Sequence, residues 1–405
     1  MAVLTPFRAL RPVPEAAARV AAVPYDVVTT DEARALADGN PLSFLHVSRA
    51  EIDLPSGTDP HADVVYDKAA ANFRALTLAA PLVVEDTTSL YIYRLRANGH
   101  EQTGIAGCYS LDEYDRDAIR KHERTRRDKE DDRTRHMVGL RAQTGPVFLT
   151  YRAIAAIDGR VRAATSAPPL IDLTAPDGVS HTIWRLADRD AQALIEAVRQ
   201  IPALYIADGH HRAASAARAR QQLRGHSAQP VEADTFFAVA FPDDQVRILP
   251  YNRVVKDLGT HDARSFLARL REHYEVREGG ATMGQRGDVG MYLDDRWYHI
   301  SLGAPPPDAD PAKRLDVSRL QDSILTPLLG IGDVRTDRRI DFVGGARGTA
   351  ALEQLVNSGA AAVAFAMYPV SVAELMAISD AGEILPPKST WFEPKLRDGL
   401  LSHVI

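Results

Sequence analysis

Apolar and polar positions form short blocks along the chain, and these blocks predict strands and helices without steady strand–helix alternation. Short apolar runs bounded by turn residues are typical of strands, whereas apolar positions spaced three or four apart are typical of helices. We predict strands at 90–95, 146–151, 203–207, 236–241 and 361–367, and helices at 31–37, 64–78, 188–200, 211–223, 262–273, 317–328, 349–358 and 371–378. This mixture favours an α+β fold over a doubly wound parallel sheet.

Two turns predict hairpins. Asn98 and Gly99 form the dipeptide that two-residue hairpin turns prefer, and they follow the apolar run at 90–95. The turn that begins with Pro242 is predicted to join the run at 236–241 to a second strand at 246–250.

The length of 405 residues predicts two or three domains. The first is expected at 1–258, as a catalytic region with insertions, and the second at 259–405, as a C-terminal α/β region opened by the helix at 262–273. The proline-rich stretch at 303–311 is predicted to be a surface linker.

Charge and composition exclude several classes of protein. The formal net charge of −6 argues against a dedicated nucleic-acid-binding protein. No apolar run reaches the roughly 18 residues of a membrane span, and the start of the chain lacks the apolar core of a signal peptide. The one cysteine, Cys108, excludes an intrachain disulfide framework. We therefore expect a cytoplasmic protein that does not act at a membrane.

The common signatures of nucleotide and hydrolase sites are missing. The sequence contains no phosphate-binding P-loop motif, no Gly-x-Ser-x-Gly and no His-Glu-x-x-His. What stands out instead is Asp208-Gly209-His210-His211-Arg212, between an apolar strand and an alanine-rich helix. Such a turn presents backbone N–H groups at the positive end of a helix, which suits an anion. The plainer interpretation is that Asp208 is only a helix cap.

A dense charged segment runs from residue 120 to 141. As one helix it would place Arg124 four residues before Asp128 and Arg127 four before Asp131, which is typical of a solvated, salt-bridged face. In the functional interpretation, Arg124, Lys129 and Arg133 neutralise phosphate, and Glu123 or Glu130 serves as a base or metal ligand. The two interpretations stay open at this point.

Three further groups are candidates for chemistry. Asp26 follows an apolar stretch at 20–23 and is expected at a strand end, unless it only forms a turn. Near the C-terminus, Lys388 and Ser389 are candidate anion donors. A metal-dependent hydrolase would need ligands such as His122, His210 and His211, although adjacent histidines do not converge easily on one ion.

At these positions the sequence resembles a bacterial family catalogued as domain of unknown function 1015. The resemblance extends from residue 7 to residue 395 and covers nearly the whole chain. It is carried by Phe7-Arg8-Ala9-Leu10-Arg11-Pro12, Pro24-Tyr25-Asp26-Val27, His122-Glu123-Arg124-Thr125, Lys129-Glu130-Asp131, Ile206-Ala207-Asp208-Gly209-His210-His211-Arg212, Leu249-Pro250-x-x-Arg253-Val254-Val255 and Pro387-Lys388-Ser389-Thr390-x-Phe392-x-Pro394-Lys395.

Within that family, the Asp208–Arg212 turn is similar to the turn of free-serine kinases built on the ParB/sulfiredoxin fold. The resemblance implies a mixed-sheet, ParB/sulfiredoxin-like nucleotide-binding core with large additional α/β elements. It also implies transfer of a phosphoryl group from a nucleotide to free L-serine, giving O-phosphoserine. Sulfiredoxin needs a cysteine in this turn, where this chain has histidine, and ParB proteins add a helix-turn-helix that we do not find.

The resulting hypothesis is an ATP- or ADP-dependent serine kinase. Nucleotide phosphates are assigned to Gly209, His210, His211 and Arg212, with Thr125, Lys388 and Ser389 as further donors. Arg124 and Lys129 would stabilise the transferred group, and Mg²⁺ would sit on Asp208 with Glu123 or Glu130. The base is one of Asp26, Glu123, Glu130 and Asp208. The alternative is a nucleotide-binding regulator of ParB-like fold without acceptor activity.

Overall fold

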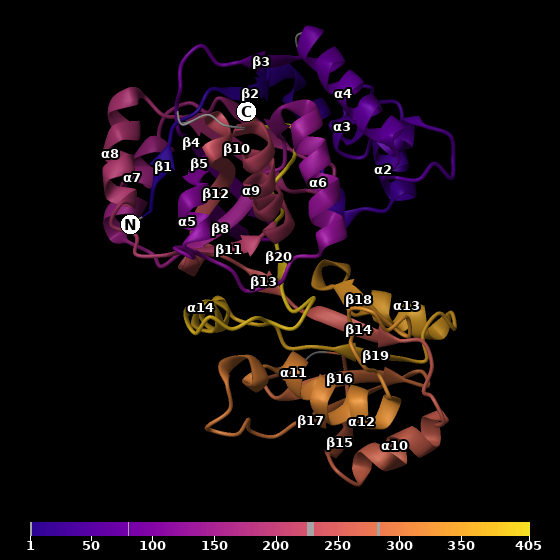
Figure 1. Cartoon of the computed structure of the whole chain (residues 1–405). Helices are drawn as coiled ribbons and strands as arrows, with labels where there is room; N and C mark the ends of the chain where they lie inside the picture. Colours follow the sequence, from indigo (N-terminus) through magenta and orange to yellow (C-terminus); the bar gives the residue numbers. More distant parts are fainter. Residues whose placement is uncertain (1, 80, 225–230, 282–283) are drawn as a thin grey trace. The chain divides into compact units, whose positions relative to one another are not determined.

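The computed structural model describes residues 2–79, 81–224, 231–281 and 284–405, and it divides into two compact units (Figure 1). The first unit comprises Met1–Val246 and Pro394–Ile405, and the second comprises Arg247–Glu393. The sequence-based division at 258/259 differs from these units at both ends of the second one. Strand β14 (Tyr251–Val255) pairs inside the second unit, and strand β21 (Ser402–Val404) returns to the first.

The first unit is built on a mixed sheet of nine described strands, in the order β6-β11-β8-β12-β5-β4-β10-β9, with β1 beside β5. β12 runs parallel to β8 and β11 runs parallel to β6, while the other neighbours are antiparallel. A mixed sheet agrees with the α+β prediction. The strands are β1 (Leu4–Thr5), β4 (Tyr91–Ala97), β5 (His100–Ser110), β6 (Ile119–Arg120), β8 (Val147–Tyr151), β9 (Ile171–Thr174), β10 (Ser180–Arg185), β11 (Leu204–Asp208) and β12 (Thr235–Pro242).

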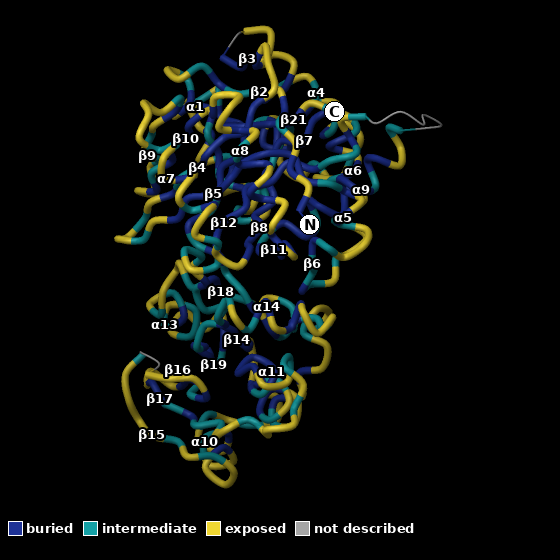
Figure 2. Tube along the Cα trace, turned by 90° about the vertical axis from the view of Figure 1, so that its left-hand side faces the viewer, coloured by how far each residue is buried: buried dark blue, intermediate teal, exposed yellow. Residues whose placement is uncertain are grey.

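One face of this sheet shares an apolar core with helices α7 (Ala155–Ala164), α8 (Asp188–Val198) and α9 (His210–Arg224). The central strands are buried along their length (Figure 2). On the other face, Phe7 contacts the rings of Tyr91 and Phe237. Phe7 also meets His403 of a four-stranded sheet ordered β3-β2-β21-β7, in which β2 is Ala9–Pro12, β3 is Leu82–Val84 and β7 is Ala142–Gln143.

A second core of the first unit lies among the helices of the N-terminal region. Its apolar side chains come from α2 (Thr30–Ala37), α3 (Leu45–Ser48), α4 (Asp63–Leu78) and the C-terminal end of α6 (Arg127–Leu140). A capping box between Thr29 and Glu32 starts α2, since each side chain accepts a backbone N–H of the other residue. The predicted helices at 31–37 and 64–78 are confirmed.

The hairpin prediction at Asn98-Gly99 is confirmed, because β4 and β5 pair with Ala97 opposite His100 and both turn residues have positive φ. The predicted hairpin at 236–250 is wrong. β12 is paired on both sides, by β5 and β8, so no edge is left for the next segment. Strand β13 (Ile248–Leu249) instead pairs with β20 (Trp391–Phe392) in the second unit.

The second unit contains a six-stranded sheet in the order β15-β17-β16-β19-β14-β18. The predicted helix at 317–328 is present as α11 (Asp316–Leu320), a π-helical turn and α12 (Thr326–Leu329). The other elements are β15 (Glu275–Glu278), β16 (Asp288–Leu293), β17 (Arg296–Ser301), β18 (Ile340–Gly344), β19 (Val363–Ala366), α10 (Ala263–Arg271), α13 (Ala350–Asn357) and α14 (Val372–Asp380). The proline-rich stretch at 303–311 lies inside this unit.

The charged segment does not form one helix. Residues 121–126 are a loop, and α6 begins only at Arg127. The predicted pairs along the helix are therefore wrong: Asp128 pairs with Arg126 at 2.8 Å, and Asp131 pairs with Arg218 of α9. The loop conformation is held from outside the segment, since His210 and His211 of α9 each accept one of its backbone N–H groups.

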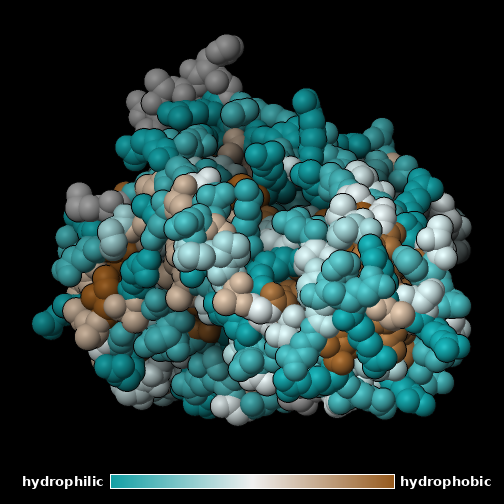
Figure 3. Space-filling model, turned by 90° about the horizontal axis from the view of Figure 1, so that it is seen from below, coloured by the Kyte–Doolittle hydropathy of each residue, from teal (hydrophilic) through white to brown (hydrophobic). Residues whose placement is uncertain are grey.

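Hydrophilic side chains cover most of the face seen in Figure 3, with apolar ones in small separate spots. Within the described ranges, no helix combines the length and the apolar character needed to cross a bilayer.

Candidate functional site

The turn between β11 and α9 has a shape that only glycine adopts easily. Gly209 has φ +96, and a Cβ atom there would lie 3.1 Å from the guanidinium carbon of Arg212. The chain can therefore leave the strand and enter the helix at once. The first N–H groups of α9 have no carbonyl of the preceding turn to bond, and they lie at the positive end of a fifteen-residue helix.

Asp208, the last residue of β11, is held by two cations. Its Oδ2 accepts from Lys395 Nζ at 3.1 Å and from Arg212 Nη2 at 3.3 Å. Burial alone would raise the pKa of Asp208, but Lys395 and Arg212 hold it well below its ordinary value. The carboxylate therefore stays ionised and anchors the turn.

Arg212 is buried in a set of protein contacts. Its Nη1 donates to the Pro146 carbonyl, and its Nη2 lies 3.3 Å from Asp208 Oδ2 and 3.9 Å from Asp26 Oδ2. Burial opposes the charge, yet Asp26 and Asp208 raise the pKa of Arg212 above its usual range. The guanidinium ties α9 to the start of β8 and to η2 (Tyr25–Val27), the turn that carries Asp26.

His122 and His210 pack edge to face, with ring centroids 4.3 Å apart. The His122 backbone N–H donates to His210 Nε2 at 3.3 Å, and neither ring nitrogen of His122 has a hydrogen-bond partner among the described residues. Burial lowers the pKa of His122 to about 3, and it lowers that of His210 well below the ordinary value, with His122 adding to the effect. Both imidazoles are neutral at neutral pH.

His211 is the more exposed member of the pair on α9. Its Nε2 accepts the Arg126 backbone N–H at 3.0 Å. Because His210 Nε2 and His211 Nε2 each accept a backbone N–H, those lone pairs are turned away from any shared ion. No group of three or more His, Cys, Asp or Glu side chains arranged to hold a metal is found in the described ranges.

The carboxylates expected in the site have different surroundings. Glu123 Oε2 lies 4.0 Å from His210 Nδ1, and its side chain is 37 % exposed. Asp26 is 39 % exposed and close to Arg212. It lies in a 3₁₀ turn rather than at a strand end, because the stretch at 20–23 contributes only an isolated bridge between Ala22 and Asp398. Glu130 is bound by Thr125 and Arg218.

The predicted anion donors are spread over both units. Arg124 is exposed in the loop before α6. Lys388 and Ser389 belong to the second unit, where Lys388 Nζ lies 5.6 Å from the Tyr251 ring centre and Ser389 donates to the Pro386 carbonyl at 2.6 Å. Lys129, on α6, lines a cavity described below.

Sequence reasoning missed two residues of the first unit's terminal segment. Lys395 binds Asp208 as described, and Asp398 lies beside Arg212. Burial raises the pKa of Asp398 to about 7, with Arg212 acting in the opposite direction. Lys395 closes the Pro387–Lys395 motif, so the motif was a usable signal for it, whereas nothing in the sequence around Asp398 indicates burial.

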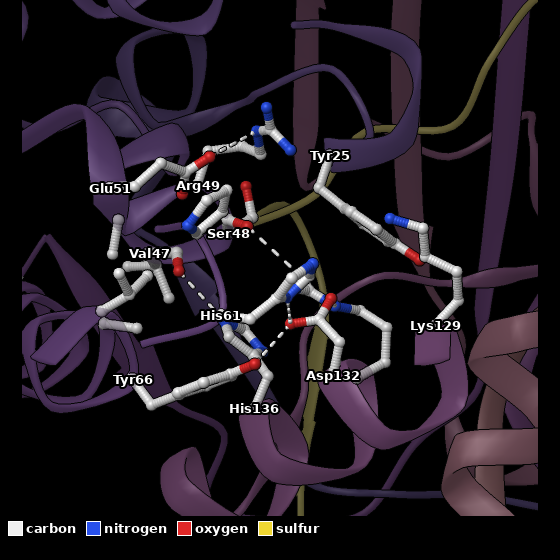
Figure 4. A pocket seen from close by; sticks show the side chains of 15 residues that line it. Tyr25, Val47, Ser48, Arg49, Glu51, His61, Tyr66, Lys129, Asp132 and His136 are labelled. Carbon is white, nitrogen blue, oxygen red and sulfur yellow. Dashed lines mark hydrogen bonds and ion pairs between the residues drawn. The ribbon is translucent and has the colours of Figure 1, made fainter. Parts of the chain in front are cut away.

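Two neighbouring cavities share part of their lining, and the smaller one borders Arg212. The smaller, about 20 Å³, is lined by Arg212, Asp398 and Gly145. The larger, about 90 Å³, lies between η2, α3 and the following η3 (Ala50–Asp53), α4 and α6 (Figure 4). Both are lined by Tyr25, Ser48, Arg133 and His136. The buried Arg133 binds Asp132 at 2.8 Å and stacks 4.1 Å from the Tyr25 ring centre.

Comparisons with known proteins find a family and several similar structures. The model of the family described as "Protein of unknown function (DUF1015)" matches residues 4–318. No curated protein matches the chain. Similar solved structures include a free serine kinase in complex with AMP (15% identity, 73% of this chain and 92% of that chain, TM-score 0.35). Others are a conserved hypothetical protein from Pyrococcus furiosus (16%, 73% and 94%, 0.36) and C-terminally truncated SbnI from Staphylococcus aureus (12%, 72% and 85%, 0.37).

Proposed function

This chain belongs to the DUF1015 family, and we propose that it is a cytoplasmic, nucleotide-dependent kinase of a small metabolite, with free L-serine as acceptor and O-phosphoserine as product. In this reaction the serine hydroxyl attacks the terminal phosphorus of ATP or ADP. The bond to the bridging oxygen breaks, and the hydroxyl proton passes to a carboxylate. The observation that carries the proposal is the β11–Gly209–α9 turn, in which Lys395 and Arg212 hold the Asp208 carboxylate in its ionised form.

The phosphates of the nucleotide are assigned to the backbone of this turn. Free N–H groups and the positive helix end favour a polyanion, and Gly209 lets it approach the main chain closely. His210 and His211 flank these N–H groups. The contacts of Arg212 with Pro146 and Asp208 favour a positioning role for its guanidinium, which fixes the turn rather than reaching for the ligand.

A magnesium ion fits the acidic residues present only together with phosphate oxygens. Mg²⁺ in kinases is held by one or two carboxylates, with substrate phosphates and waters completing its shell. Asp208, kept ionised by its cations, and the partly exposed Glu123 supply two such carboxylates. When bound, the ion would neutralise charge on the phosphate oxygens. Arg124, Thr125 and Lys129, which all belong to the first unit, are proposed as further donors toward the transferred group.

The contacts around each carboxylate favour Glu123 or Asp26 as the base. Glu130 is bound by Thr125 and Arg218, and Asp208 by Lys395 and Arg212, so neither is well placed to accept a proton. Glu123 and Asp26 are both more than one third exposed. A ParB/sulfiredoxin-like core is the fold that we propose for the catalytic sheet.

The direct test is to incubate the purified full chain with L-serine, Mg²⁺ and either ATP or ADP, and to measure O-phosphoserine by mass spectrometry. Product that depends on both substrates supports the kinase. Nucleotide binding or slow hydrolysis without an acceptor would instead favour a nucleotide-responsive regulator. The orientation of His210 Nε2 and His211 Nε2 toward backbone donors argues against a metal-dependent hydrolase.

A further inference from the structure

The larger of the two cavities lined by Tyr25 and Arg133 has the size of a small metabolite. Its volume of about 90 Å³ corresponds to roughly six to nine water-sized positions, at about 10–15 Å³ for each. A small amino acid such as serine has roughly that number of non-hydrogen atoms. The walls come from η2, the α3–η3 region, α4 and α6, so most of the cavity belongs to the N-terminal helical region (Figure 4).

Both signs of charge line this cavity. Arg49 Nε lies 3.1 Å from Glu51 Oε1, and Arg133 Nε lies 2.8 Å from Asp132 Oδ2. Glu51 and Asp132 are both buried, which is costly for a carboxylate unless it is paired. The cavity therefore holds two fixed ion pairs, and a ligand that carries both signs can bridge them without leaving a buried charge alone.

Asp132 and Glu51 differ in how many of their carboxylate oxygens already have a partner. Asp132 accepts from Tyr66 at 2.7 Å, from His61 at 3.3 Å and from Arg133, so both of its oxygens are used. Oε1 of Glu51 accepts a hydrogen bond from Thr30 and lies 3.1 Å from Arg49 Nε, which makes no hydrogen bond with any described residue. Oε2 of Glu51 is thus the carboxylate oxygen that can accept from a ligand.

A buried hydroxyl points to a missing partner. Ser48 lines both cavities and is only 4 % exposed, yet its Oγ makes no hydrogen bond with any described residue. Because an unsatisfied buried hydroxyl is destabilising, native proteins usually provide it with a partner. A polar ligand in the cavity would supply one.

We propose that this cavity binds the acceptor as a zwitterion, with its carboxylate on Arg49 and Arg133 and its ammonium on Glu51 Oε2. The inference rests on the proposed function, because it names where and in which charge state the acceptor of that reaction is held. Lys129 lines the same cavity, so the acceptor lies near a cation assigned to the transferred phosphoryl group. A hydroxy acid has no ammonium for Glu51 Oε2, and an amino alcohol has no carboxylate for the two arginines.

The test is calorimetric titration of the full chain with L-serine, D-glycerate and ethanolamine, with and without AMP. We expect L-serine to bind at least about tenfold more tightly than either analogue, because each analogue leaves buried polar groups unpaired. Glu51→Gln should weaken L-serine and leave D-glycerate unchanged, whereas Arg49→Gln should weaken both. Arg199→Gln, which changes an exposed arginine paired with Glu196, is the matched control.

Circular dichroism is used to check that each variant folds. Should Glu51→Gln unfold, Ser48→Ala keeps the proposal testable, since it removes only the unpartnered hydroxyl and should weaken L-serine. Equal affinities for L-serine and D-glycerate, or an unchanged L-serine affinity in both Glu51→Gln and Ser48→Ala, would overturn the zwitterion site. Failure of AMP to bind, or of O-phosphoserine to form, would count against the kinase instead, because L-serine binding is measured independently of both.

Discussion

Two clusters in the first unit are built around buried histidines, and they differ in how their polar atoms are satisfied. In one, His181 bonds Tyr93 through Nδ1 and Arg397 through Nε2, both at 3.1 Å. In the other, His122 lies against His210 with neither of its ring nitrogens bonded to a described residue. Burial lowers the pKa of His181, as it lowers that of His122.

We interpret the His181 cluster as structural and assign the His122–His210 cluster to the proposed ligand-binding site. A fully bonded buried histidine fixes neighbouring segments and has nothing left for a ligand. An unbonded one, next to partly exposed carboxylates such as Glu123, is typical of a place where a ligand completes the bonding. The two clusters are joined in sequence, since Arg397 of the first precedes Asp398, which lies beside Arg212.

The largest effect is expected on replacing the carboxylates near the His122–His210 cluster. Removing the base should lower kcat by about 10²–10⁴-fold, so we expect this loss in Glu123→Gln or in Asp26→Asn, measured as O-phosphoserine formation. Glu130→Gln is the matched control, because Thr125 and Arg218 already occupy that carboxylate. Near wild-type turnover in both Glu123→Gln and Asp26→Asn would show that neither residue is the base.

Asp398 should make stability fall as pH rises. Burial raises its pKa from 3.8 to about 7, so between these values the folded protein holds a proton that the unfolded chain has lost. The contribution of Asp398 to the free energy of unfolding therefore decreases across this window and is constant above it. The free energy of unfolding should therefore change between about pH 4 and about pH 8 differently in Asp398→Asn and in the wild type, by up to about 4 kcal/mol. Urea unfolding at the two pH values measures this difference. Parallel profiles for variant and wild type would contradict the assignment.

The bonded cluster predicts a large loss of stability without any role in chemistry. Arg397→Met removes the partner of His181 Nε2 and of Asp177. We expect destabilisation by about 3 kcal/mol, because a buried polar atom is left unsatisfied. Arg199→Met, which breaks the exposed pair with Glu196, should cost less than about 1 kcal/mol in the same urea experiment. If Arg397→Met and Arg199→Met lower the free energy of unfolding equally, the structural role of Arg397 is contradicted.

The smallest effect is expected from the unbonded ring. In His122→Leu the lost packing against His210 is offset by removal of two unsatisfied nitrogens, so stability should change by no more than about 1 kcal/mol. His181→Leu should cost at least about 2 kcal/mol, because Tyr93 and Arg397 lose a buried partner. Thermal unfolding of the two variants measures the contrast, and a reversed order would contradict it.

Local sequence was sufficient for elements whose signals are contiguous. The strand before Asp208, the helix after Gly209 and the turn between them follow from an apolar run, a glycine and an alanine-rich stretch. The charged segment could not be predicted in the same way. Its first residues look helical by charge spacing, but His210 and His211 of a distant helix hold them as a loop.

The sequence alone determined the mixed α+β character, the β11–α9 turn and most of the candidate acidic residues, because backbone preferences and hydrophobic period act over a few neighbours. Only the tertiary structure decided which charges meet. Lys395 binds Asp208, which lies 187 positions earlier in the chain. Asp398 pairs with Ala22 in an isolated bridge and lies beside Arg212. Strand pairing brings such segments together, and burial then sets their protonation, so neither property can be deduced from spacing along the chain.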